Sequence, residues 1–284
     1  MEVSGVLLYS ETTNLYRILE IKIQSMTPET ITILRRRNCM KPWLIVTGAS
    51  GSLAETFIPL ALKSDWRILA VTRQKDLPAI FESSEITIIQ ADVSTMRGTG
   101  SVINFFKERD EVPEGLAHLA GSFLLAGLLQ TSEEQYRACL AANLDSAFFM
   151  LKAFVTLRKK HDNGGSAVFV SSVVSESGVA FHEAVAAAKG GLESLVRASA
   201  ATHARDGIRI NAVRSGLMDT KAAAPLLRNE QSRKMAQKQY PLGELIQPDQ
   251  VAKAILFLLE EAQITGQILS VDGGFNAIRP LVTI

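Results

Sequence analysis

A serine, a histidine and a lysine stand at spacings that could bring a hydroxyl, an imidazole and an ammonium together. Ser172 ends the apolar run "AVFVSS", and Lys189 follows 17 residues later in "FHEAVAAAK", which also contains His182 and Val185. On a helix, His182, Val185 and Lys189 share one face, because seven steps of 100° bring His182 within about 20° of Lys189. His182 would then lie about two turns, roughly 10 Å, from Lys189 along the axis. An imidazole can donate a proton near neutral pH, so these residues suit proton transfer to a substrate.

The elements that must position these residues are short apolar runs alternating with helical patterns. Most of the runs are continuously apolar, as is typical of strands covered on both faces. One helical pattern, over residues 131–160, has Thr131 and Glu134 at capping-box spacing. This alternation predicts a Rossmann-type α/β fold: a doubly wound parallel sheet with helices on both faces and right-handed crossovers. The predicted strands span residues 43–47, 67–72, 86–90, 116–120, 167–172, 208–213 and 267–271.

The fold signals begin abruptly in "MKPWLIVTGAS", so we expect a single dinucleotide-binding domain over residues 40–284. Residues 1–39 are then an N-terminal extension or the result of an over-long start-site assignment. They have the order of neither a signal peptide nor a transit peptide. With 284 residues, one large α/β domain accounts for the rest of the chain.

Composition narrows the classes of partner. The formal net charge of +1 gives no electrostatic reason to expect nucleic acid or a membrane surface. No apolar run reaches the roughly 18–20 residues that span a bilayer. Cys39 and Cys139 form neither a metal-ligand spacing nor a disulfide framework, which favours a reduced, cytoplasmic setting. We expect a small-molecule substrate and no metal.

A ligand of such a fold binds at the carboxyl ends of the strands. The first predicted strand runs into "TGASGSLAE". Gly48 can make a tight turn, and Gly51, Ser52 and Ala54 are small enough for the backbone to approach a pyrophosphate at a helix N-terminus.

The second predicted strand ends in Thr72 and Arg73, where an acidic residue would bind a ribose diol. A guanidinium suits a 2′-phosphate, so this position favours NADP over NAD as the cofactor. The alternative interpretation is that Arg73 is a solvated loop cation.

Together these segments resemble the short-chain dehydrogenase/reductase superfamily over about residues 42–276. The matching motifs are "TGASGSLA", "ADVS", "HLAG", "AANLDSAFF", "VFVSS", "AAAKGGL", "GIRINAVRSGLMDT" and "TGQILSVDGG". The resemblance implies the following cofactor-binding residues: Gly48, Ser50, Gly51, Ser52, Leu53, Arg73, Asp92, Val93, Ala120, Gly121, Lys189, Gly216, Met218 and Thr220.

The resemblance also implies a chemistry, in which hydride moves between a nicotinamide and a carbonyl carbon. A serine (here Ser172) orients the carbonyl oxygen, a tyrosine donates the proton, and a lysine (Lys189) binds the ribose and lowers the pKa of the tyrosine. An asparagine (Asn143) holds a water that links the lysine to solvent. In this chain Val185 stands where the family has its tyrosine, four residues before the lysine. The chain is therefore similar to a divergent member that lacks this tyrosine.

His182 is the candidate replacement, because the enoyl-acyl-carrier-protein reductases of the same superfamily carry their tyrosine seven residues before the lysine. The alternative is a histidine that caps or packs at the start of its helix. His118, in "HLAG", is a second candidate donor, although local hydrogen bonding near the cofactor is its simpler interpretation.

Two function classes stay open at this point. One is an NADPH-dependent oxidoreductase acting on a small carbonyl, alcohol or activated alkene. The other is a catalytically silent dinucleotide-binding protein with a regulatory or assembly role. The resemblance implies a homodimer or homotetramer, and residues 217–245 are expected to form a mobile helical flap over the substrate.

Overall fold

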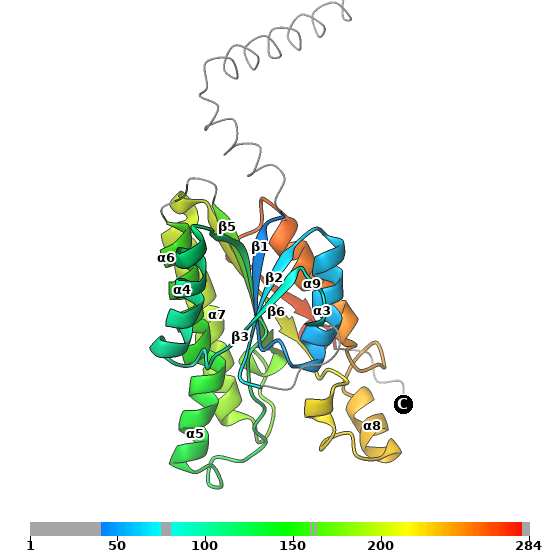
Figure 1. The fold of residues 1–284 in the computed structure, drawn as a ribbon. Helices are drawn as coiled ribbons and strands as arrows, with labels where there is room; N and C mark the ends of the chain where they lie inside the picture. Colours follow the sequence, from blue (N-terminus) through cyan, green and yellow to red (C-terminus); the bar gives the residue numbers. More distant parts are fainter. Residues whose placement is uncertain (1–40, 75–80, 160, 162–163, 280–284) are drawn as a thin grey trace, which may run out of the picture. The chain divides into compact units, whose positions relative to one another are not determined.

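One seven-stranded parallel sheet organises the part of the chain that the structure, a computed structural model, describes: residues 41–74, 81–159, 161 and 164–279 (Figure 1). The strand order is β3-β2-β1-β4-β5-β6-β7. The chain thus winds outward from β1 in one direction and then, from β4 onward, in the other. This confirms the predicted doubly wound α/β class. The strands are β1 (Trp43–Thr47), β2 (Arg67–Thr72), β3 (Ile86–Gln90), β4 (Pro113–His118), β5 (Gly165–Ser172), β6 (Ile208–Ser215) and β7 (Ile268–Val271).

Helices cover both faces of this sheet. On one face lie α3 (Ser52–Lys63) and α9 (Pro248–Glu260), and on the other lie α4 (Met96–Arg109), α6 (Ser146–Arg158) and α7 (Glu183–His203) (Figure 1). Shorter elements stand beyond the carboxyl ends of the strands. They are α5 (Glu133–Leu140), the π-helical turn η2 (Ala141–Asp145), α8 (Glu230–Gln237) and the 3-10 turns η3 (Val173–Ser175) and η5 (Lys221–Ala223), while a further 3-10 turn, η4 (Ala204–Asp206), follows α7.

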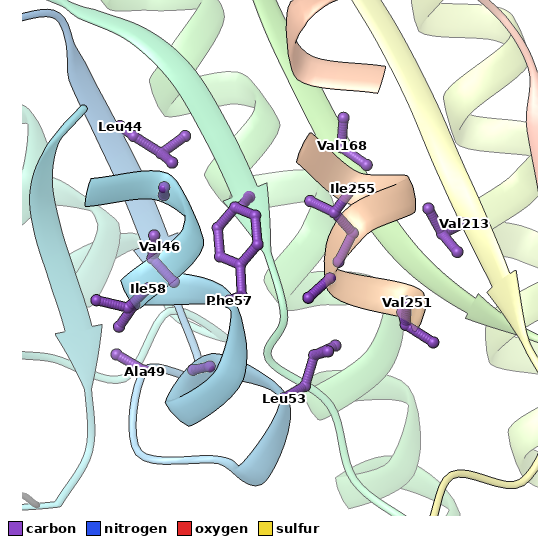
Figure 2. Packing of buried hydrophobic residues seen from close by; sticks show 14 of the residues in the cluster. Leu44, Val46, Ala49, Leu53, Phe57, Ile58, Val168, Val213, Val251 and Ile255 are labelled. Atoms are coloured by element: carbon purple, nitrogen blue, oxygen red, sulfur yellow. The ribbon is translucent and has the colours of Figure 1, made fainter. Parts of the chain in front are cut away.

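Alternate residues of each central strand face opposite layers, so the sheet has two cores. In β1, Val46 packs with Phe57 of α3 and Ile255 of α9, as Figure 2 shows. Its neighbour Ile45 faces the other layer and packs in the cluster that includes Phe154 of α6. Each such fully buried side chain contributes about 1.5–3 kcal/mol relative to exposure, which explains why these strands are apolar throughout.

The observed bounds of β5, β6 and β7 differ from the predicted ones by one or two residues at one end, and the structure corrects two further sequence expectations. The fourth strand spans Pro113–His118 rather than 116–120, because the chain leaves the sheet after His118, the last residue paired with β1. The capping box at the start of α5 is formed by Ser132 and Gln135, one residue after the predicted Thr131 and Glu134. The Thr131 hydroxyl instead donates to the Gly127 carbonyl oxygen at 2.9 Å, closing the preceding turn.

The helical run from Glu133 to Arg158 is long and apolar enough to cross a membrane by length and composition, with 44% of its most apolar stretch buried. Within the fold, α6 places Met150 and Phe154 in the core against the sheet. Packing in the domain therefore accounts for its apolar character.

The chain divides after Lys41, so residues 42–284 form one unit. The predicted extension over residues 1–39 lies outside the described residues and stays a prediction.

Gly98 of α4 offers a test of how the fold fixes the loop after β3. A Cβ at Gly98 would lie 1.9 Å from the Asp92 carbonyl oxygen, whereas a Cβ at Gly100 on the same helix would meet no atom within 4 Å. Gly98→Ala should lower the free energy of unfolding by about 1–3 kcal/mol through overpacking. Gly100→Ala should raise it by about 0.5–1 kcal/mol through helix propensity. Urea denaturation measures both, and equal stabilities of the two variants would contradict the close approach.

Candidate active site

A cavity of about 900 Å³ lies at the carboxyl edge of the sheet, where the strand order reverses between β1 and β4. This volume is in the range that holds a small-molecule ligand or cofactor. Loops after β1, β4, β5 and β6 meet there, as expected at the switch point of a doubly wound sheet. The predicted site residues on its wall are Gly51, Ser52, Leu53, Ala120, Gly121, Asn143, Ser172, His182, Lys189, Gly216, Met218 and Thr220.

The turn after β1 leaves a helix N-terminus open to this cavity. Gly48 has φ +65°, and a Cβ there would lie 2.7 Å from the Ala120 backbone nitrogen, so only glycine fits. Helix α3 then begins at Ser52 with Gly51 as its N-cap, and no side chain caps it. The first backbone N–H groups of a helix have no partner within it, and together with the helix dipole they favour an anion. This turn fits the pyrophosphate of a dinucleotide.

The end of β2 lies beside this turn but outside the cavity wall. The Thr72 hydroxyl donates to Ser50 Oγ at 3.1 Å, tying the two strand ends together. The carbonyl oxygen of Arg73 accepts a hydrogen bond from the Gln90 side chain at 3.0 Å. The Arg73 guanidinium itself is exposed and makes no hydrogen bond or ion pair with the described residues. It is therefore available to a phosphate at the carboxyl edge.

Asp92 and Val93 follow β3 at the same edge and also lie outside the cavity wall. The Asp92 carboxylate accepts hydrogen bonds from the Ser94 backbone N–H at 3.0 Å and from the Ser94 hydroxyl at 2.7 Å. These bonds and the nearby Arg73 charge outweigh burial and hold the pKa of Asp92 below its ordinary value. Val93 is buried in the core. Local bonds thus fix the carboxylate in its ionised form.

Lys189 points from α7 toward the ends of β4 and β5. Its Nζ donates to the Val170 carbonyl oxygen at 2.8 Å. The same nitrogen lies close to the loop after β4, since a Cβ built at Gly121 would be 3.5 Å from it. Burial lowers the pKa of Lys189 to about 8, which a small contribution from Cys139 opposes. The side chain is therefore mostly an ammonium at pH 7 and loses its charge as the pH rises through about 8.

Asn143 lies in the π-helical turn η2 that separates α5 from α6. Such turns change the helix register by one residue and are frequent at functional sites. The Asn143 amide donates to the Cys139 carbonyl oxygen at 3.0 Å and to the Ser122 carbonyl oxygen at 3.2 Å, and its Oδ1 accepts from the Ser122 backbone N–H at 3.2 Å. Asn143 therefore fixes the loop after β4 to the helix beneath it.

Ser172 ends β5, and its hydroxyl accepts only a long hydrogen bond, 3.5 Å from the Val174 backbone N–H, among the described residues. The turn that follows is held by Glu193, one helical turn after Lys189. Its carboxylate accepts from Ser171 Oγ at 2.8 Å and from Ser175 Oγ at 2.5 Å. Ser172 thus keeps its hydroxyl available in a rigid turn.

Glu193 in turn pairs with Arg214 of β6, which donates through Nε at 2.9 Å and Nη2 at 2.7 Å. Burial opposes ionisation of Glu193, but the hydrogen bonds from Arg214, Ser175 and Ser171 prevail and lower its pKa. Removing one partner of a buried pair leaves an uncompensated charge, so loss of either residue would destabilise the turn after β5. The sequence analysis did not find it, because β6 and α7 meet only in the fold.

His182 lies on the cavity wall as the N-cap residue of α7, with Val185 one turn further along. The His182 Nδ1 is 2.8 Å from the Ala180 carbonyl oxygen, and the ring meets Phe123 edge-on at a centroid distance of 5.8 Å. A carbonyl oxygen only accepts, so Nδ1 carries a hydrogen and Nε2 is the second ring nitrogen left for a ligand. Val185 is buried and apolar, beside the same cavity.

His118 has a different environment. It is 1% exposed, and its ring nitrogens pair with Thr47 Oγ1 at 2.9 Å and Ser146 Oγ at 3.1 Å. Burial, with a smaller contribution from the Lys189 charge, lowers the pKa of His118 to about 3. His118 is therefore a neutral residue that links β1, β4 and α6, which agrees with the simpler of its two interpretations.

Tyr240 is a cavity residue that the sequence analysis did not assign. Its hydroxyl accepts a hydrogen bond from the Leu217 backbone N–H at 2.7 Å, and a Cβ at Gly216 would lie 2.7 Å from its ring. Ser215 is buried, and its hydroxyl donates to the Gly216 carbonyl oxygen at 2.8 Å. Burial, as the largest cause, raises the pKa of Tyr240. Tyr240 thus fixes the segment after β6, which continues into the short helix α8.

The described residues contain no group of three or more His, Cys, Asp or Glu side chains that could hold a metal ion. The site therefore offers hydroxyl, imidazole and ammonium groups beside an open helix N-terminus.

Comparisons with known proteins agree with this geometry. A family model described as enoyl-(acyl carrier protein) reductase matches residues 48–276. Carbonyl reductase family member 4 of Danio rerio is 38% identical over 248 residues, covering 82% of this chain and 98% of that protein. The 3-oxoacyl-(acyl-carrier-protein) reductase FabG of Chlamydia pneumoniae is 28% identical over 242 residues, 82% of this chain and 96% of that protein.

Among solved structures, ElxO with NADP bound has a TM-score of 0.77 and 26% identity, covering 83% of this chain and 99% of ElxO. The fold and the site define a nucleotide-binding oxidoreductase. The chain belongs to the short-chain dehydrogenase/reductase superfamily, whose members use NAD(P)(H) and act on small molecules.

Proposed function

We propose that the chain is an NADPH-preferring reductase, or the reverse dehydrogenase, for a small apolar carbonyl compound or activated alkene, with His182 as its proton donor. The observation that carries this proposal is a single cavity that holds both the dinucleotide turn and the groups for catalysis. Gly51 and Ser52 line one part of its wall, and Ser172, His182 and Lys189 line another.

The wall of the cavity favours an apolar substrate. Beyond the polar groups just named, it is formed largely by aliphatic and aromatic side chains, including Phe123, Val174, Leu226, Met235 and Phe275. Leu226 and Met235 belong to the predicted flap over 217–245, in which α8 buries no residue. We propose that this segment covers the substrate; its mobility stays a prediction.

Each polar group has a role that its surroundings support. A bound nicotinamide dinucleotide supplies or accepts the hydride. Ser172, with its nearly free hydroxyl, donates a hydrogen bond that orients the substrate oxygen. Lys189, as an ammonium below about pH 8, binds ribose hydroxyls and stabilises negative charge near them.

His182 would deliver the proton from Nε2, since Nδ1 donates to Ala180. Donation from Nε2 while Nδ1 keeps its hydrogen requires the cationic imidazolium. On this proposal Val185 takes the family's usual tyrosine position, and its side chain has no proton to donate. If His182 were inert, loss of the general acid would slow turnover by about 10²- to 10⁴-fold, and the chain would approach the catalytically silent dinucleotide-binding alternative.

The NADP preference rests on Arg73, whose exposed guanidinium follows β2 beside the turn that fits the pyrophosphate. A guanidinium binds a 2′-phosphate in bidentate fashion, whereas a 2′-hydroxyl gains little from it. That ElxO has been solved with NADP bound supports the same preference.

A homodimer or homotetramer and a cytoplasmic location are further parts of the proposal. Tyr136 of α5 and Phe148 of α6 are 37% and 50% exposed, and large apolar side chains on neighbouring helices suit a subunit interface. The buried free thiol of Cys139 fits a reducing compartment.

Replacing Arg73 tests the cofactor preference. The wild type should bind NADPH about tenfold or more tightly than NADH, because a bidentate charged contact is worth about 1.5–3 kcal/mol. Arg73→Ala should weaken NADPH binding and leave NADH binding nearly unchanged, as fluorescence titration would show. Arg137→Ala, which removes a 69%-exposed guanidinium from α5, is the matched control and should change neither affinity. Equal wild-type affinities for the two cofactors would rule out the assignment.

Replacing His182 tests the proton donor. With a panel of small apolar ketones, the pH profile of NADPH oxidation compares the wild type with His182→Ala. The substitution should lower the rate about 10²- to 10⁴-fold and leave NADPH affinity unchanged, because it removes the proton donor but no group that binds the cofactor. Any residual rate should still fall near pH 8, where Lys189 loses its charge.

Two variants serve as controls for this experiment. His203→Ala changes the histidine at the other end of α7, which pairs with Asp206, and should leave the profile intact. Tyr240→Phe tests whether the cavity tyrosine is the donor. A normal rate in His182→Ala, or loss of turnover in Tyr240→Phe without loss of stability, would contradict the role of His182.

A further inference from the structure

One aromatic residue of the active-site cavity, Phe275, comes from the segment that follows β7. Its side chain packs against two apolar clusters. One lies between the sheet and the layer of α3 and α9, and the other contains Val173, Val174 and Val185. Val173 directly follows Ser172, and Val185 lies one helical turn after the His182 N-cap. Phe275 therefore lies against the residues that flank the proposed catalytic groups.

The turn that presents Phe275 is fixed by the buried side chain of Asp272. Its two carboxylate oxygens accept hydrogen bonds from the backbone N–H groups of Gly274 at 2.9 Å and Asn276 at 3.2 Å. The Asp272 carbonyl oxygen accepts a further bond from the Phe275 N–H at 3.0 Å. Gly273 and Gly274 have φ +58° and +87°, a region that favours glycine, and they allow the chain to turn here.

Asn276 ties the same segment to the turn after β5. Its Oδ1 accepts a hydrogen bond from Ser177 Oγ at 2.6 Å, and its Nδ2 donates to the Glu176 carboxylate at 3.1 Å. Glu176 also forms an ion pair with Arg214 of β6. The segment after β7 and the turn after β5 are therefore fixed to each other.

The cavity thus has one firmly held side and one more open side. On the held side, the Phe275 ring meets the Tyr240 ring at a centroid distance of 5.4 Å, and Tyr240 is itself bonded to the Leu217 N–H. On the open side, Phe123 and Met235 are 42% and 63% exposed, and Met235 belongs to α8, which buries no residue. A ligand group is therefore restricted beside Phe275 and can extend past the other two side chains.

We propose that Phe275 is a specificity-determining residue, which limits one substituent of the reacting carbon to a compact group such as methyl. The other substituent extends past Phe123 and Met235. A packed wall rejects a bulkier group because overpacking forces strain, whereas a chain that leaves by a partly exposed edge meets no such limit. The substrate is then an apolar carbonyl compound with one compact and one long substituent, for example an alkyl methyl ketone. This inference rests on the proposed function, since it names the substrate class of the same site.

Initial rates of NADPH oxidation with heptyl methyl ketone and heptyl phenyl ketone test this proposal. The two ketones share the long chain and differ in the other substituent. The ratio of their kcat/KM values is compared between variants, so differences in intrinsic reactivity cancel. Phe275→Ala removes a phenyl ring from the wall and should shift this ratio toward the phenyl ketone about tenfold or more. Phe275→Leu, which keeps a shorter apolar side chain and guards against loss of folding, should shift it the same way by a smaller factor.

Phe257→Ala is the matched control, because it removes a 47%-exposed phenyl ring of α9 that is not part of the cavity wall. It should leave the ratio unchanged. Calorimetry with the same ketones and oxidised NADP, which has no hydride to give, measures binding without turnover, and the ratio of dissociation constants should shift in the same way. Ketones that bind with this shift but are not reduced would refute the proposed reductase activity and support the role of Phe275. An unchanged ratio in both Phe275 variants, or an equal shift in Phe257→Ala, would overturn the proposal.

Discussion

The close approach of the turn after β1 to the end of β4 is the constraint on which the functional edge depends. With Gly48 against the Ala120 backbone, no side chain can separate the two strand ends. The crossovers from β1 and β4 run to opposite sides of the sheet, so a crevice opens above this contact. The N-terminus of α3 enters the crevice from one side, and Lys189 enters it from the other.

Much of this arrangement could be predicted from the sequence, because burial on both faces demands continuously apolar strands. The bounds of β1, β2 and β3 agree with the predicted ones, and small residues after β1 predicted the turn. Errors arose where a local pattern had two nearly equivalent readings. The spacing of Thr131 and Glu134 predicted a capping box, but Ser132 and Gln135 form it, one residue later. The Thr131 hydroxyl cannot cap the helix, because it donates to the preceding turn.

Contacts between distant segments could not be predicted, since no local spacing encodes them. Tyr240 reaches the cavity from 23 residues beyond Leu217, to which it is hydrogen-bonded. Glu193 of α7 meets its partner Arg214 only because β6 packs beside α7 in the fold. Arg158 has the sequence context of a solvated helix end, yet the fold buries it. The sequence thus indicated which groups could react, while their supporting partners emerged only from tertiary packing.

The most direct test of the central claim is a crystal structure of the chain with NADP and an unreactive carbonyl analogue bound. The claim predicts the pyrophosphate at the N-terminus of α3 and the analogue oxygen within hydrogen-bonding distance of Ser172. It also predicts His182 Nε2 at about 2.6–3.2 Å from that oxygen, directly or through one water. An analogue oxygen that contacts Ser172 and Lys189 while the His182 ring faces away would contradict the account.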